Sequence, residues 1–490
     1  MSSSLLPYFL MIPAGLGFLI PLLGRSRIRP ADTLAALGTG LLLALSLFTL
    51  GKTGKHLVGG WPQPIGITLA LDPLSSLMLT LIAGLGLCAS IFSIRALDRH
   101  TGRSHYYSLF LLMIAGMNGV ALTRDLFNLY VFLELASISS YALVAFSAEA
   151  EDLEAGFKYA ILSGLGSIFI LLGIAVVYLC YGTVNLPQLA ERLALAPAGE
   201  LKNFSLILLL AGFCIKAGLI PFHFWLPDAH PAAPAPVSAM LSGILIKALG
   251  LYALARLLFN VYGLSPGLGR LLLGLGALSM IGGVLLAIGQ NDFKRMLAYH
   301  SISQIGYIAL AFGLGTPLGI MAGIYHLVNH AAFKSLLFLS AGAVEYRTGT
   351  RDLNELGGLR ARMPVTSAAS LVGSLSIAGV PPLNGFFSKL LIIFACVQAG
   401  RQGLAAAAVI VSILTLASFM KVQRAAFFGP LKDKWTGLKE VPFSMQLSLF
   451  LLMAACLALS LLVLPGLREQ FLNSAQAVLS AGIMPAGGSR

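Results

Sequence analysis

The sequence predicts an all-α polytopic membrane protein with about 14 transmembrane helices, and two observations support this. Hydrophobic residues make up 57% of the 490 residues and charged residues only 10%, whereas a soluble domain carries about 25% charged residues. The mean hydropathy is +0.87, and the apolar residues gather in runs near the length of about 20 residues that a membrane-spanning helix needs. A soluble globular protein is therefore excluded.

The apolar runs can be followed along the whole chain. The first run lacks a preceding basic segment and a clear small-residue cleavage site, so we expect it to be a span and not a removed signal. The 14 runs cover residues 5–23, 33–50, 72–94, 106–122, 126–146, 157–180, 204–222, 237–259, 268–289, 298–314, 317–344, 366–398, 404–426 and 443–464.

The basic residues predict the orientation in the membrane. The loops after odd-numbered runs hold 18 Lys and Arg residues, and the even-numbered loops with the tail hold 9. Cytoplasmic loops carry the excess of Lys and Arg, so both termini are predicted to lie outside the cytoplasm. The formal charge of +13 reflects these loops, and no basic patch interleaved with aromatic residues indicates nucleic-acid binding.

The sequence predicts no metal, cofactor or catalytic centre. The five cysteines, Cys88, Cys180, Cys214, Cys396 and Cys456, lie far apart in or beside apolar runs, and none forms a CxxC pair. This spacing argues against iron–sulfur clusters, structural zinc and disulfides. The chain also has no P-loop, so the energy for any transport must come from partners or from an ion gradient.

Two proline-containing stretches interrupt the seventh and twelfth runs. Residues 218–238 read GLIPFHFWLPDAHPAAPAPVS, and residues 378–389 read AGVPPLNGFFSK. Proline cannot continue a regular helix, and unwound backbone at membrane depth must be buried or line a wet cavity. The likeness of AGLIP to AGVPP, five spans apart, predicts a five-helix unit used twice. Paired breaks in matching halves of a transporter point to the ion site.

A few titratable side chains lie inside the apolar runs. A charge there is costly and usually faces the protein interior, where it has a function. These residues are Glu134, Lys216, Lys247, His326, His330, Lys334 and Lys389. Because they come from five spans, we expect them to form a line of titratable groups through the middle of the membrane.

The segment IYHLVNHAAFKSLLFL places His326, His330 and Lys334 at positions i, i+4 and i+8. Each step of four residues turns the helix by a net angle of about 40° and rises about 6 Å. The three side chains therefore share one face. One water can bridge imidazoles at this separation, and histidine titrates near neutral pH and can pass a proton between its two nitrogens.

Structural roles stay open for the same residues. Intramembrane histidines also make plain interhelical hydrogen bonds, and Lys389, near a break, can have a structural role. Glu134 and Lys216 could form an ion pair that only fixes packing. His223 and His230 flank the first break, where they can serve as loop hydrogen-bonding groups or as a gate for proton uptake.

Five motifs together resemble one family: the antiporter-like, proton-conducting subunits of respiratory complex I, Mrp-type cation/proton antiporters and membrane-bound group 4 hydrogenases. They lie between about Leu71 and Lys421. The motifs are DLFNLYVFLELASISSYALVAF, IKAGLIPFHFWLPDAHPAAPAPVSAMLSG, NDFKRMLAYHSISQIGYI, YHLVNHAAFKSLLFLSAG and AGVPPLNGFFSK.

The resemblance implies two inverted five-helix repeats, over spans 4–8 and 9–13. The expected parts are residues 1–105 with three spans, 106–260 and 261–426 with one repeat each, and 427–490 with the last span and a short tail. By resemblance, Glu134 pairs with Lys216 as a switch that changes the proton affinity of the lysine. Lys247 connects this pair to the histidine helix, and Lys389 lies near the exit.

The sequence therefore predicts a proton-translocating subunit in the inner (plasma) membrane of a prokaryote. The expected partners are other membrane subunits, homologous antiporter-like subunits among them, and a hydrogenase or quinone-reductase module. Exchange for Na⁺ is the alternative driving force for proton transport. Two alternatives stay open. One is a stand-alone Na⁺/H⁺ antiporter, against which the scarcity of carboxylates in the spans beyond Glu134 argues. The other is a structural scaffold.

Overall fold

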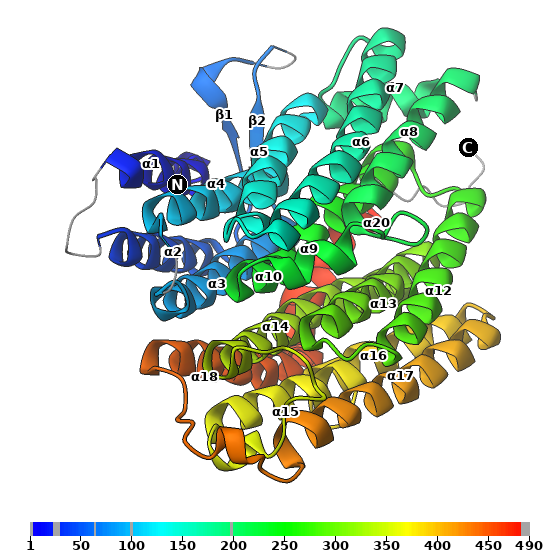
Figure 1. Ribbon diagram of the computed structural model, residues 1–490. Helices are drawn as coiled ribbons and strands as arrows, with labels where there is room; N and C mark the ends of the chain where they lie inside the picture. Colours follow the sequence, from blue (N-terminus) through cyan, green and yellow to red (C-terminus); the bar gives the residue numbers. More distant parts are fainter. Residues whose placement is uncertain (1–2, 23–29, 63–64, 99–100, 197–198, 482–490) are drawn as a thin grey trace.

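A computed structural model describes residues 3–22, 30–62, 65–98, 101–196 and 199–481, and most of them are helical (Figure 1). In this part of the chain, strands β1 (Gly54–Leu57) and β2 (Thr68–Leu71) form one antiparallel pair. The helices are α1 (Tyr8–Leu22), α2 (Pro30–Thr49), α3 (Pro73–Ala96), α4 (Arg103–Leu122), α5 (Leu126–Val144), α6 (Ala150–Tyr181), α7 (Leu186–Leu195), α8 (Glu200–Ala217), α9 (Leu226–Ala232), α10 (Ala235–Met240), α11 (Ala253–Leu257), α12 (Pro266–Ile288), α13 (Phe293–Gly313), α14 (Pro317–Thr348), α15 (Pro364–Ala378), α16 (Asn384–Gln398), α17 (Gln402–Val422), α18 (Phe443–Ala458), α19 (Pro465–Leu467) and α20 (Ser474–Ser480).

Within the described residues, 11 helices are long and apolar enough to cross a membrane. Each coincides with a predicted run, which confirms a mostly helical membrane protein. The other three runs correspond to α8, to α13 and to the pair α15 and α16, whose two helices are each 15 residues long. The total of 14 spans and the inverted repeats stay predictions. The loop with Arg25, Arg27 and Arg29, which contributed to the orientation, lies outside the described residues, as does Arg99.

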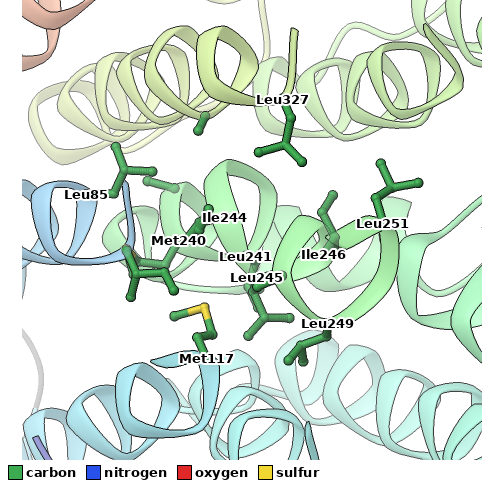
Figure 2. Packing of buried hydrophobic residues seen from close by; sticks show 14 of the residues in the cluster. Leu85, Met117, Met240, Leu241, Ile244, Leu245, Ile246, Leu249, Leu251 and Leu327 are labelled. Carbon is green, nitrogen blue, oxygen red and sulfur yellow. The ribbon is translucent and has the colours of Figure 1, made fainter. Parts of the chain in front are cut away.

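Two helices are enclosed by the others. The spans Ala235–Tyr262 and Pro317–Thr348 are wholly buried in their apolar windows. Figure 2 shows Leu85 of α3, Met117 of α4 and Leu327 of α14 packed around the first of these two spans. A helix that is hydrophobic on all sides belongs in such an interior. The two enclosed helices carry four of the predicted site residues, so the fold places those residues away from lipid.

Both predicted breaks are present, and they are built alike. Helix α8 ends before Gly218, with φ of +68°, and α15 ends before Gly379, with φ of +84°. At each break the next residue donates a backbone hydrogen bond to the carbonyl five positions earlier, over 3.2 Å at Leu219 and 3.0 Å at Val380. Only glycine takes this left-handed turn without strain, which explains the shared sequence AG.

The predicted start of the tenth run is wrong. The run 298–314 predicts a helix start at residue 298, which would leave Asp292, Lys294 and Arg295 in the loop before it. Helix α13 instead begins at Phe293, and Asp292 caps it by accepting a hydrogen bond from the Arg295 amide over 2.8 Å. Lys294 is 2% exposed. Charged and polar residues such as Asp292 occur both in loops and at helix N-caps, so the sequence alone did not show that the helix begins here.

Candidate functional site

The predicted row of titratable residues is buried in the protein. Lys247, His326, His330 and Lys334 are 0% exposed, and Lys216 and Lys389 are nearly so. The Glu134 side chain is 23% exposed. Desolvated charges are costly unless other groups satisfy them, so the neighbours of each residue show what the row can do.

Glu134 of α5 and Lys216 of α8 lie together, as the family pattern implies. The lysine Nζ is 3.5 Å from the glutamate Oε1. This is longer than the roughly 2.7–2.9 Å of a tight charge-assisted hydrogen bond. Ser167 of α6 donates a hydrogen bond to the same Oε1. The ion pair is therefore loose, and a neutral donor shares its carboxylate.

Three hydroxyl groups surround Lys216. Its Nζ donates to Ser163 Oγ over 2.8 Å, to Ser137 Oγ over 3.0 Å and to the Tyr141 hydroxyl over 3.3 Å. Tyr141 in turn donates to Ser163 over 2.7 Å. We call Ser137, Tyr141 and Ser163 the hydroxyl cage. An ammonium has three protons to donate, so the cage can hold Lys216 without Glu134.

Lys247 lies in an irregular part of its span. Between α10 and α11 the helix has π-helical segments over Leu241–Leu245 and Lys247–Tyr252. The Lys247 Nζ donates to the carbonyls of Ser242 over 2.5 Å and Gly243 over 2.6 Å. A π-helical turn departs from the usual i to i+4 pairing and often marks a functional site. Here, carbonyl oxygens of the same helix solvate the lysine.

A short polar path joins Lys247 to Lys334. The Oγ atoms of Ser242 and Ser301 lie 2.7 Å apart. Ser301 donates to the Leu297 carbonyl over 3.0 Å, and Lys334 donates to the same oxygen. The charge of Lys247 also acts on Lys334. The first and second halves of the row are thus connected through α13.

The two histidines of α14 continue the row from Lys334. The ring centroids of His326 and His330 are 6.2 Å apart, and the rings are tilted by 16°. This agrees with the rise of about 6 Å expected for i and i+4. His326 lies 2.9 Å from Ser388 Oγ through Nδ1 and 3.2 Å from Gln304 Oε1 through Nε2. Within the described residues, His330 has no hydrogen-bond partner.

The remaining predicted residues lie at the two breaks. Lys389 of α16 has its Nζ 4.8 Å from the Tyr307 ring centroid, and its stem packs against Gly379. His230 of α9 is 0% exposed, and the charges of Lys334 and Lys247 act on its ring. His223 packs on the neighbouring Phe224 ring at 4.5 Å. His230 therefore approaches the row, while His223 lies in the broken segment itself.

Comparison with known proteins identifies the family. Residues 123–415, more than half of the chain, match the family described as NADH:quinone oxidoreductase/Mrp antiporter, transmembrane. The chain belongs to this family. It is 36% identical over 393 residues to a Na⁺/H⁺ antiporter subunit of Alkalihalophilus pseudofirmus, covering 80% of this chain and 79% of that protein.

Another relative and a solved structure agree with this family. The chain is 37% identical over 402 residues to an NADH-quinone oxidoreductase subunit of Desulforudis audaxviator, covering 81% of this chain and 80% of that one. It superposes on a chain of the Mrp complex from Dietzia sp. with a TM-score of 0.90 and 31% identity, covering 98% of this chain and 97% of the other. The predicted resemblance is confirmed.

Sequence reasoning missed an ion cluster in this antiporter-family chain. Arg256 donates to both carboxylate oxygens of Asp72, over 2.6 and 2.8 Å, and Arg124 pairs with the same carboxylate. Burial alone would raise the pKa of Asp72, but Arg256 and Arg124 outweigh it and hold that pKa below its ordinary value. Asp72 also caps the start of α3, where its side chain accepts a hydrogen bond from the Ser75 amide. Arg256 lies within an apolar run, so the criterion that selected Lys247 also applies to it.

A buried histidine was also missed. His300 of α13 is 0% exposed, its Nε2 lies 2.9 Å from Ser418 Oγ, and the charges of Lys334 and Lys389 act on it. Its position in the motif NDFKRMLAYHSISQIGYI was the available signal. In the part of the chain that the structure describes, no group of three or more His, Cys, Asp or Glu residues could hold a metal ion.

Proposed function

We propose that this chain is a proton-translocating, antiporter-like subunit of a multi-subunit membrane complex. One observation carries the proposal: a row of buried titratable side chains follows the two enclosed helices and reaches both broken segments. The row begins at the partly exposed Glu134 and continues through the buried Lys216, Lys247, Lys334, His330, His326 and Lys389. Buried ionisable groups that face one another inside a membrane protein are typical of proton relays.

The loose pair at the start of the row supplies a switch. When Lys216 bonds to Glu134, the carboxylate favours the charged lysine; when the hydroxyl cage holds it, that support is lost. Lys216 can then release its proton toward Lys247. A positive charge on Lys247 disfavours one on Lys334, so a proton that arrives on Lys247 favours release of the proton on Lys334 toward the histidines and Lys389.

We also propose the arrangement around this row. The repeats cover residues 106–260 and 261–426, flanked by residues 1–105 and 427–490, and the alike breaks support this division. The membrane is the inner membrane of a prokaryote, with both chain termini outside the cytoplasm; the distribution of basic residues supports the orientation. His230 and His223 lie at the cytoplasmic intake.

The driving force is either a redox module or exchange for Na⁺. A relative named as an NADH-quinone oxidoreductase subunit favours the first, and one named as a Na⁺/H⁺ antiporter subunit favours the second. Purification of the chain through a tag at its native locus, followed by mass spectrometry, separates them. Iron–sulfur redox subunits in the preparation indicate redox drive, and small membrane subunits alone indicate ion exchange.

The test of proton transport uses the assembled complex in liposomes with a pH-sensitive dye inside. A potassium diffusion potential drives uptake, so the test does not depend on the natural driver. We expect Lys216→Met and Glu134→Gln to lower proton uptake at least tenfold. Lys202→Met is the matched control, because Lys202 lies on the same helix and, among the described residues, its Nζ bonds to the Leu193 carbonyl over 2.9 Å and to no residue of the row. Uptake unchanged in Lys216→Met would exclude the proposed function.

A further inference from the structure

Two cations from the second half of the chain hold the end of α9, in the first half. Lys294 of α13 donates to the Ala233 carbonyl over 3.2 Å, and Arg351 donates to the Pro231 carbonyl over 2.6 Å. Both carbonyls lie at the C-terminal end of α9. Such carbonyls have no partner within the helix and carry a partial negative charge, so cations bind there favourably.

Carboxylates fix the two cations in place. Lys294 Nζ lies 2.7 Å from Glu345 Oε2, and Arg351 Nε lies 3.1 Å from Asp292 Oδ2 and 3.7 Å from Glu345 Oε1. A cleft of about 720 Å³ lies over this network. Its lining includes Ala233, Lys294, Glu345, Arg351, Glu149 and Asp152. The end of α9 therefore meets a polar, largely acidic cleft.

The same helix carries His230 on the inner side of the network. The His230 ring centroid is 5.7 Å from that of Phe338 on α14. The Leu226 backbone lies within hydrogen-bonding reach of the ring, and the charges of Lys334 and Lys247 act on it. His230 lies one residue before Pro231 and three before Ala233, the two carbonyls that the cations hold. A shift of the α9 end would therefore move this ring relative to both lysines.

We propose that Lys294 and Arg351 are positioning residues that fix α9, so that His230 takes protons from the cleft and passes them to the buried lysines. The inference rests on the proposed function and gives the row its intake. In each step a proton leaves an acid in the cleft for an imidazole nitrogen, and then leaves the imidazolium for a neutral lysine amine. No electron transfer or other reactant is needed.

The test compares variants of the assembled complex in the same liposome assay. Lys294→Gln should lower proton uptake about tenfold, which corresponds to about 1.4 kcal/mol in an activation barrier. Lys294→Arg should retain most of the activity, because it keeps the cation. Lys421→Gln is the matched control: Lys421 likewise holds the end of a helix, through the carbonyls of Ile288 over 3.1 Å and Gln290 over 2.7 Å, but that helix is α12. Its uptake should stay unchanged.

A double variant shows whether Lys294 acts through His230. If it does, the variant with both Lys294→Gln and His230→Gln transports no more slowly than His230→Gln alone, since interacting sites are non-additive. Fully additive losses, or a Lys294→Gln complex as active as the control, would overturn the inference. If Lys294→Gln does not assemble, Arg351→Gln takes its place with the same expectations. Lys216→Met distinguishes a failure of this inference from a failure of the proposed function. If Lys216→Met is inactive while Lys294→Gln is active, only the inference fails. If Lys216→Met is active, the proposed function fails.

Discussion

The contact between Gly250 and Ala217 predicts that Gly250→Ala will damage both stability and transport. A Cβ atom at Gly250 would lie 2.5 Å from the Ala217 Cα and 2.6 Å from its Cβ. Non-bonded carbon atoms approach to about 3.5–4.0 Å, so the two helices would have to separate by roughly 1 Å. Overpacking of this kind costs about 1–3 kcal/mol.

The same contact sets the distance between Lys216 and Lys247. Lys216 is the residue before Ala217, and Lys247 lies about one turn before Gly250. A shift between α8 and the span Ala235–Tyr262 therefore widens the step that a proton must cross. We expect Gly250→Ala to lower proton uptake several-fold while the assembled complex can still be purified.

Gly274→Ala on α12 is the control for this substitution. A Cβ there would have no atom within 4 Å, and alanine favours a helix by up to about 1 kcal/mol over glycine. The measurements are the thermal denaturation temperature in detergent and proton uptake in liposomes. We expect Gly250→Ala to lower both and Gly274→Ala to lower neither. Equal behaviour of the two variants would refute the packing argument.

Two further predictions concern the ion cluster and the hydroxyl cage. Asp72→Asn leaves Arg256 without its carboxylate, which should cost about 3 kcal/mol. Glu154 forms an exposed ion pair with Lys158 over 2.7 Å, so Glu154→Gln should have almost no effect on stability. Thermal denaturation that does not separate the two variants would contradict this. The pKa of Asp72 in the folded chain lies below its unfolded value near 4. The stabilisation that Asp72 gives is therefore present above about pH 4 and is lost as the pH falls. The difference in denaturation temperature between Asp72→Asn and the unchanged chain should shrink on acidification. Ser163→Ala removes the nearest hydrogen-bond acceptor of Lys216. It should slow proton uptake about tenfold, which is within the range of coupling between neighbouring sites. Uptake at the unchanged rate would show that the hydroxyl cage has a role in packing but none in transport.

The sequence was sufficient for the features that local chemistry determines. Apolar runs of membrane-spanning length predicted the helices, because length and hydropathy are properties of one segment. The prolines in residues 218–238 and 378–389 predicted both breaks for the same reason. The stripe of His326, His330 and Lys334 followed from helical geometry alone, and the structure gives the expected ring separation.

Contacts between distant segments could not be predicted from the residues alone. Asp72 and Arg256 are 184 positions apart, and nothing near either one identifies the other. The hydroxyl cage draws on two helices, and serines in apolar helices usually bond to their own backbone, as Ser139 does. The burial of Lys294 depends on how α13 packs against α9. In each case tertiary packing gives an ordinary residue type its special surroundings.

The most direct measurement of proton movement along the row compares the unchanged complex with Lys334→Met in liposomes under a potassium diffusion potential. Lys334 is fully buried and lies between the serine path and the two histidines, so a proton on the row must pass it. We expect Lys334→Met to reduce uptake to the level of liposomes without protein while the complex stays intact. Uptake at the unchanged rate in an intact Lys334→Met complex would show that protons do not follow this row.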